Sequence, residues 1–167
     1  GSFLNLFEYP DSSNLQKWCN ENNISITDIQ VMNDFEIGGY TCDTIQIMTY
    51  DSMYWCWDKN YNNFIMANRK DAQSWETFSA IKFQSGKTLL SSMELEYLKV
   101  DPYNKRLIGF KNTFKNSDLV SFQPCNDSNR FYIKLYGKYA TVNSSTREVF
   151  LTDAPDGLLS EFYVKSM

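Results

Sequence analysis

Hydrophobic and polar residues alternate over short stretches in the last quarter of the chain, and polar turns separate these stretches. The pattern predicts four strands, at Phe131–Leu135, Tyr139–Val142, Glu148–Leu151 and Phe162–Val164. Alternation with a period of two, enriched in β-branched and aromatic residues, is typical of strands with one buried face. The connections between them are rich in Asn, Asp, Ser and Gly, which favour turns. This part of the chain therefore predicts one unit of four strands.

The same layout occurs twice earlier in the chain, anchored on Tyr54 and Tyr97 as it is later on Tyr139. In each unit, equivalent positions open the first strand, open the third strand and close the unit. The first strands are Ile45–Met48, Thr88–Ser91 and Phe131–Leu135, the third strands open at Phe64, Leu107 and Val149, and the closing residues are Phe78, Phe122 and Phe162. Three four-stranded repeats of about 42 residues predict an all-β fold, the β-trefoil, over residues 43–167. An ordinary all-β domain with regularly spaced strands is the alternative.

The strands that follow the anchor tyrosines indicate which side chains face the core. Period two turns the apolar positions inward, namely Trp55 and Trp57, Leu98 and Val100, and Ala140 and Val142. The alternate positions, Cys56, Lys99 and Thr141, are predicted to face solvent or a neighbouring hairpin. Both tryptophans are thus predicted to be core residues rather than a platform for a ligand.

Residues 1–42 do not follow the threefold pattern and predict a short mixed α/β extension, ordered strand–helix–strand. Ser2–Tyr9 is apolar, Leu15, Trp18 and Cys19 share one face of a short helix, and Ile24–Met32 has strand character. Two interpretations stay open. The extension either continues from a neighbouring domain of a larger chain, or it is an arm that covers one edge of the barrel.

The composition disfavours several classes of partner. With 167 residues the chain can form one domain, and its net charge is −4 with a pI of about 4.8. A mildly acidic protein does not attract phosphate backbones or anionic lipids, so neither nucleic acid nor a membrane surface is expected. The sequence has no apolar run of about 18 residues and no signal-peptide pattern. The compartment, cytoplasmic or secreted, stays open.

The residue types also disfavour catalysis. The chain has no histidine, which excludes Ser-His-Asp and Cys-His machinery, and it has no glycine-rich phosphate loop. Cys19, Cys42, Cys56 and Cys125 form no C-x-x-C pair, so neither a metal nor another cofactor is expected, and three disulfide pairings are open. The carboxylates stand in or beside turns, where capping explains them. We therefore expect a protein that is not an enzyme.

Several short motifs resemble a known repeat. Gly137-Lys138-Tyr139, then Thr141-Val142-Asn143 and Glu161-Phe162, resemble the repeat of the fascin-like (actin-crosslinking) β-trefoils. Trp75-Glu76-Thr77-Phe78 resembles the closing strand of the same group, whereas the second unit closes with Val120-Ser121-Phe122 and lacks the glutamate. The resemblance covers residues 43–167. It implies a general binding scaffold, since such trefoils include actin bundlers, sugar-binding modules and toxin appendages.

A carbohydrate-binding module is the first functional hypothesis. A turn carboxylate or amide beside an exposed aromatic ring suits a sugar, because the polar group binds hydroxyls and the ring packs against C–H groups. The candidate ligand-binding residues are Asp58 with Tyr61, Asp101 with Tyr103, and Asn143, whose turn lacks an aromatic residue. Gln73-Ser-Trp75 also resembles the Q-x-W motif of ricin-type sugar-binding trefoils, although it occurs only once.

A protein-binding trefoil is the second hypothesis. Its partner would be actin, another cytoskeletal protein or a different protein, or the trefoil would be the appendage of a larger toxin or enzyme. Actin bundling requires basic patches that meet an acidic filament, and the net charge of −4 argues against it.

Overall fold

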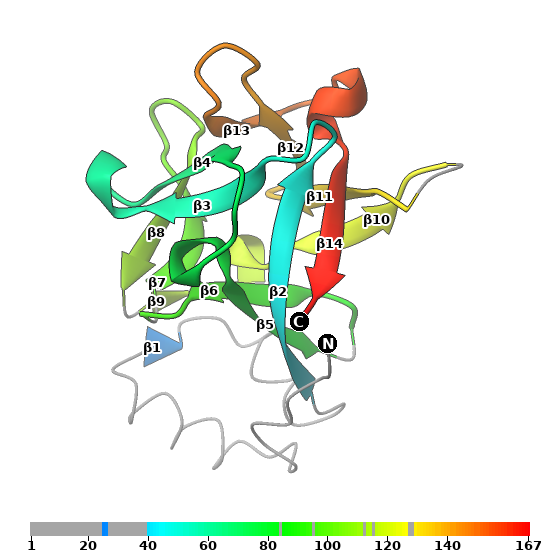
Figure 1. Cartoon of the computed structure of the whole chain (residues 1–167). Coiled ribbons are helices and arrows are strands. Elements are labelled where there is room, and N and C mark those ends of the chain that lie inside the picture. Colours follow the sequence, from blue (N-terminus) through cyan, green and yellow to red (C-terminus); the bar gives the residue numbers. More distant parts are fainter. Residues whose placement is uncertain are drawn as a thin grey trace.

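A computed structural model describes residues 25–26, 40–83, 85–94, 96–111, 113–114, 116–126 and 129–167 (Figure 1). The predicted strand Ser2–Tyr9 and the predicted helix around Trp18 lie outside the described residues. Of the predicted strand at Ile24–Met32, the described part is β1 (Ser25–Ile26), which pairs in parallel with β9 (Thr113–Phe114). No helix within the described ranges is long and apolar enough to cross a membrane.

Twelve further strands form three lobes of four (Figure 1). Lobe one contains β2 (Tyr40–Thr49), β3 (Tyr54–Asp58), β4 (Phe64–Arg69) and β5 (Phe78–Phe83). Lobe two contains β6 (Thr88–Ser92), β7 (Glu96–Val100), β8 (Leu107–Lys111) and β10 (Ser121–Pro124). Lobe three contains β11 (Phe131–Leu135), β12 (Lys138–Val142), β13 (Val149–Thr152) and β14 (Phe162–Ser166). The three predicted four-stranded units are confirmed, and the first strand begins at Tyr40 rather than Ile45.

The first and fourth strands of the lobes close a barrel. The fourth strand of each lobe pairs with the first strand of the next lobe, as β5 with β6, β10 with β11, and β14 with β2. First and fourth strands of the same lobe also pair, as β2 with β5 and β11 with β14, and in lobe two through the bridge between Thr88 and Val120. Since every barrel strand has neighbours on both sides, the described barrel has no free edge.

The second and third strands of each lobe form a hairpin, and a ring of backbone hydrogen bonds joins the three hairpins. A residue one or two positions before each third strand has a left-handed backbone, with φ of 64° at Asn63, 60° at Lys105 and 66° at Arg147. Its carbonyl accepts an N–H from the hairpin of another lobe. The bonds run from Gly109 N to Asn63 O (3.0 Å), from Leu151 N to Lys105 O (2.9 Å) and from Ala67 N to Arg147 O (2.8 Å). The chain thereby links the lobes in a closed cycle.

The core fills the space between the barrel and the hairpins. Trp55 and Trp57 are fully buried, as predicted, and they meet Phe162 and Phe78 in edge-to-face contacts at 5.0 and 5.4 Å. Leu98, Ala140 and Val142 are also buried, at positions equivalent to the tryptophans. The large rings of lobe one are therefore balanced by small side chains in lobe three, which preserves the packing density of the core.

The prediction for Cys56 and Thr141 is wrong, because both are buried under the connection that precedes the fourth strand of their own lobe. Lys99 keeps 19% of its side chain exposed, but its ammonium group pairs with the equivalent connection of lobe two. Lys99 Nζ contacts Asp118 Oδ2 at 2.7 Å, and Thr141 Oγ1 lies 2.8 Å from Ser160 Oγ. The Cys56 thiol faces the Glu76 carboxylate. Three short 3₁₀ turns carry these partners, namely η2 (Ser74–Glu76), η3 (Asn116–Asp118) and η4 (Gly157–Ser160).

Gly109 is required by the packing of Trp57. A Cβ atom at this position would lie 1.9 Å from Trp57 Nε1, which is far inside van der Waals contact. We expect Gly109→Ala to lower the free energy of unfolding by about 1–3 kcal/mol, because the buried indole has to move. Urea denaturation measures the change. In the double variant with Trp57→Phe, the narrower ring should make the combined loss smaller than the sum of the two single losses, and an additive result would contradict this explanation.

Arg147 also ties lobe three to lobe one through its side chain. Its Nε donates to the Ala67 carbonyl at 2.9 Å, and its two terminal nitrogens donate to both Asp51 carboxylate oxygens at 3.1 and 2.9 Å. Partial burial raises the pKa of Asp51, but the hydrogen bonds from Arg147 and Thr49 outweigh it, so the pKa lies below its usual value.

A depressed pKa links this contact to pH. The contribution of the Asp51 contact to the free energy of unfolding is fully present above the pKa of an unfolded aspartate, about 3.9. It is lost as the pH falls through the lower pKa that Asp51 has in the folded protein. We expect Asp51→Asn to lose less stability than the wild type between about pH 5 and pH 3. Thermal unfolding at both values tests this, and identical losses in the two proteins would contradict it.

Candidate functional site

The structure gives the predicted residues Asp58, Asp101 and Asn143 the same position, at the start of the hairpin turn in each lobe. In each case the side-chain Oδ1 accepts a backbone N–H two residues later, at 2.9 Å in all three lobes. This geometry is the Asx turn, which closes the hairpin. Asp58 is also completely buried and forms an ion pair with Arg69 at 3.0 Å.

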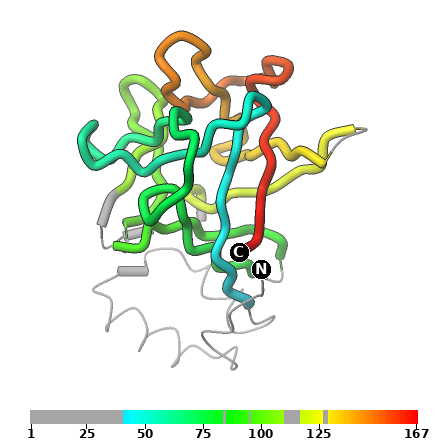
Figure 2. The backbone as a smooth tube through the Cα atoms, viewed as in Figure 1, coloured from blue at the N-terminus to red at the C-terminus, as the bar shows by residue number. Residues whose placement is uncertain are grey.

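The predicted aromatic partners behave differently. Tyr61 is 58% exposed and Tyr103 is 96% exposed, so both rings are accessible. Tyr61 does not share a surface with Asp58, because the Asp58 carboxylate has no exposed area. The three hairpin turns also project separately from the molecule (Figure 2), so the predicted residues of different lobes do not converge on one site.

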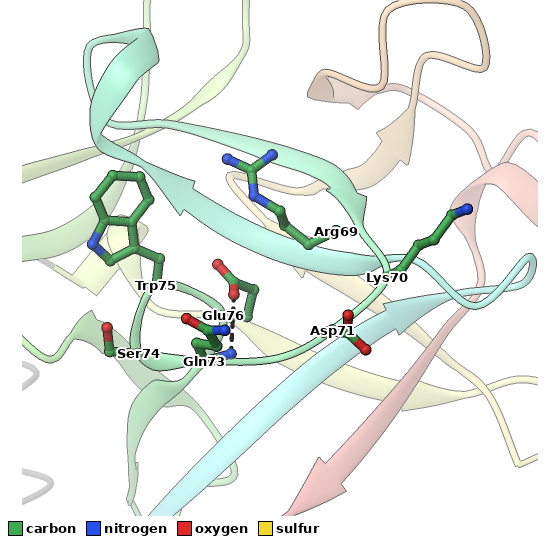
Figure 3. Close-up of a pocket in the computed structure, with 7 residues that line it drawn as sticks. All are labelled: Arg69, Lys70, Asp71, Gln73, Ser74, Trp75 and Glu76. Carbon is green, nitrogen blue, oxygen red and sulfur yellow. Dashed lines mark hydrogen bonds between the residues drawn. The ribbon is translucent and has the colours of Figure 1, made fainter.

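A pocket of about 470 Å³ lies along the connection between β4 and β5. Its lining contains an aromatic ring, two basic groups, two carboxylates and two neutral polar side chains. These residues are Arg69, Lys70, Asp71, Gln73, Ser74, Trp75 and Glu76 (Figure 3). We call it the Trp75 pocket.

Local hydrogen bonds fix the backbone of the Trp75 pocket. Glu76 is 95% buried, and its Oε1 accepts the Gln73 backbone N–H at 3.0 Å (Figure 3). The Glu76 N–H donates in return to the Gln73 carbonyl at 3.2 Å, which closes the turn η2. Thr77 Oγ1 donates to the same carbonyl at 2.7 Å. These bonds hold Trp75 at the pocket with its ring partly exposed.

The charged groups of the Trp75 pocket are of two kinds. Arg69 is fixed, because it donates to Asp58 at 3.0 Å and to Asn68 at 2.7 Å. Lys70 and Asp71 are exposed, and neither forms an ion pair or side-chain hydrogen bond with another described residue. Figure 3 shows the Trp75 indole and the Arg69 guanidinium on either side of the Glu76 carboxylate, with Lys70 pointing away.

This arrangement combines an accessible ring with fixed hydrogen-bonding groups, which suits a ligand that has both C–H faces and hydroxyl groups. No group of three or more His, Cys, Asp or Glu side chains in the described ranges could hold a metal ion. The sequence signalled part of this site, since Gln73-Ser-Trp75 resembles a sugar-binding motif. The sequence did not predict Arg69 or Asp71 as site residues. The course of the β4–β5 connection places them in the pocket.

No protein-family model matches the sequence, and no curated protein matches it. Solved structures do. One is described as a "BEL beta-trefoil", with a TM-score of 0.63 and 12% identity over 75% of this chain and 93% of that chain. The fold is a β-trefoil. At this identity the likeness shows the fold alone, and membership of the fascin-like group is not confirmed.

Two further similar structures are a lectin and a glycosidase. A ricin B-like lectin from Macrolepiota procera in complex with lactose has a TM-score of 0.61 and 14% identity, over 73% of this chain and 94% of the lectin. An endo-β-galactosidase from Clostridium perfringens has a TM-score of 0.61 and 16% identity. The matched region is 75% of this chain but only 32% of the galactosidase.

The connection that carries the Trp75 pocket also protects Cys56. Burial, together with the Glu76 carboxylate beside it, raises the pKa of this thiol far above its ordinary value, and the side chain has no exposed area. We expect Cys56 to resist iodoacetamide in the folded protein at about pH 8, because only the thiolate reacts. Peptide mass spectrometry after alkylation measures each cysteine separately.

Alkylation of the unfolded protein in urea, with the same peptide analysis, is the control for the intrinsic reactivity of each thiol. Glu76→Ala should increase the labelling of Cys56, since it removes the bond that closes η2. Labelling of Cys56 in the folded wild type at the rate found in urea would contradict the buried position.

Proposed function

We propose that this β-trefoil is a non-catalytic carbohydrate-binding module and that the Trp75 pocket is its sugar site. One observation carries the proposal: a partly exposed indole stands beside an arginine that is held in place and beside a turn that carries Gln73 and Ser74. Because Arg69 and the backbone of the turn are held in place before a ligand arrives, binding requires little ordering of these groups.

Each residue of the pocket has a defined part in this proposal. The Trp75 ring packs against the C–H face of a sugar, because the faces of aromatic rings are apolar. Arg69 donates hydrogen bonds, the Gln73 amide donates and accepts them, and the Asp71 carboxylate accepts them from hydroxyl groups. Glu76 is a positioning residue, since its buried carboxylate closes the turn.

The similar structures support this class of ligand without assigning it. The lectin was solved with lactose, and the galactosidase acts on a glycan, so β-trefoils are found in proteins that handle sugars. The low identity means that no site residue is transferred from them. The choice of sugar in this chain follows from its own pocket.

The hairpin turns supply an alternative site within the same proposal. Tyr103 with Asp101, Tyr61 with Asp58, and Asn143 in the third lobe are the predicted ligand contacts. The burial of Asp58 removes its carboxylate from any ligand surface, which leaves the exposed Tyr103 turn as the stronger of these candidates.

A glycan array with the wild type, Trp75→Ala and Tyr103→Ala separates the two sites. We expect Trp75→Ala to weaken binding at least about tenfold, which corresponds to about 1.4 kcal/mol, because truncating a central aromatic contact removes most of its packing. Tyr103→Ala should bind like the wild type. Circular dichroism melts establish that both variants are folded, and the reverse order of effects would move the site to the hairpin turn.

Two other results would overturn the proposal. If the wild type bound no glycan on the array, a protein partner would be favoured. Co-sedimentation with actin and pull-down from extract would then test that alternative. Release of new reducing ends from a bound glycan would show catalysis, in contradiction to a module that only binds.

A further inference from the structure

We propose a second ligand site, between lobes two and three, that binds an acidic oligosaccharide. A pocket of about 390 Å³ lies between η3, β10 and the turn from β11 to β12. Its polar lining comes from Lys87, Lys134, Ser117, Ser121 and Gln123. Tyr136, which is 38% exposed, stands at its edge, and we call this site the Tyr136 pocket.

The charge of the Tyr136 pocket distinguishes it from the Trp75 pocket. Two ammonium groups, Lys87 and Lys134, line it, and no carboxylate does so among the residues that the structure describes. The Tyr136 hydroxyl donates a hydrogen bond to the carboxylate of Asp118, which does not itself line the pocket. Asp118 has no exposed area and is paired with Lys99 at 2.7 Å, so it does not cancel the positive charge of the lining.

This excess of positive charge is local, because the whole chain has 20 acidic and 16 basic residues. A positive pocket on an acidic protein attracts anions only over a short range, since salt screens more distant charges over about 8 Å. The expected ligand therefore carries its own anionic groups at the point of contact. Ser117, Ser121 and Gln123 add hydrogen-bonding groups for hydroxyls, which favours a sugar over a simple anion.

A second cavity, of about 440 Å³, also has Tyr136 in its lining and has an apolar floor. Lys105 and Lys138 supply its positive charge, since Lys99, which also lines it, is paired with Asp118. Lys138 pairs at 2.5 Å with Asp153, whose side chain is 86% exposed, and an exposed pair of this kind contributes little and exchanges readily with another anion. Lys105 forms no ion pair with a described residue within 4 Å.

Tyr136, which both cavities share, lies in a tight turn. Tyr136 and Gly137 both have positive φ, of 56° and 69°, and form the tight turn between β11 and β12. The turn and the hydrogen bond to Asp118 hold the Tyr136 side chain, which lines both cavities. A ligand that meets lysines on both sides has to be longer than one sugar ring, which indicates an oligosaccharide with carboxylate or sulfate groups.

Isothermal titration calorimetry with three tetrasaccharides tests the site. A heparin tetrasaccharide presents sulfates and carboxylates, its desulfated and N-acetylated form presents carboxylates alone, and maltotetraose is neutral. We expect at least one anionic tetrasaccharide to bind, with Lys134→Gln and Lys87→Gln each weakening it about fivefold. The two anionic probes distinguish sulfate from carboxylate recognition.

Lys82→Gln is the matched control, because Lys82 is an exposed lysine on β5 and does not line either cavity beside Tyr136. Equal weakening by Lys82→Gln would show attraction to overall charge and overturn the site, as would absence of binding by both anionic probes or equal affinity for maltotetraose. Thermal melts confirm that the variants are folded. Trp75→Ala should leave this binding unchanged, so the site can fail or succeed independently of the Trp75 pocket.

Discussion

Three backbone hydrogen bonds hold the hairpins of the lobes in a ring, and the positions of the pockets depend on that ring. Each bond requires a residue in the left-handed region, and at a residue other than glycine this conformation costs about 1–2 kcal/mol. Asn63, Lys105 and Arg147 accept this cost because their carbonyls then reach the neighbouring lobe. Gly109 joins the ring to the core, since it donates one of the bonds and its missing side chain leaves room for Trp57. The ring and the core are therefore one unit.

The sequence predicted the fold because its signal is repeated three times. A single stretch of alternating hydrophobic residues is ambiguous. Three such units at a spacing of about 42 residues predict the same set of strands in each unit. The errors have a common physical cause. Asp43 interrupts the alternation at the start of β2, yet it is buried, accepting the Thr44 N–H and a bond from the Ser166 hydroxyl. Lys99 likewise has a partner, Asp118, that the local pattern does not reveal. Buried polar pairs formed across the chain are not visible in local periodicity.

The site was less predictable than the fold. Asp58, Asp101 and Asn143 are predicted ligand contacts because they are polar residues in turns, and a side chain that closes a turn has the same composition and spacing as one that binds a ligand. Only burial and hydrogen bonds distinguish them, and these depend on the folded chain. Gln73 and Trp75 gave a usable signal because their turn is local. Arg69 is close to Gln73 in sequence, but its orientation depends on the ion pair with Asp58, which the local pattern does not reveal. The Tyr136 pocket depends on contacts between strands that are distant in sequence, which no short window of sequence contains.

The pairing of β14 with β2 has a consequence for synthesis. The five registered pairs join Phe162–Ser166 to residues 45–49, so β2 leaves the ribosome long before its partner does. During that interval β5 can pair with one edge of β2, while the other edge offers unsatisfied N–H and C=O groups. Contacts between such distant residues also form slowly. A nascent chain of this protein thus depends on protection of one strand edge until β14 emerges, and a truncation before Phe162 would make that exposure permanent.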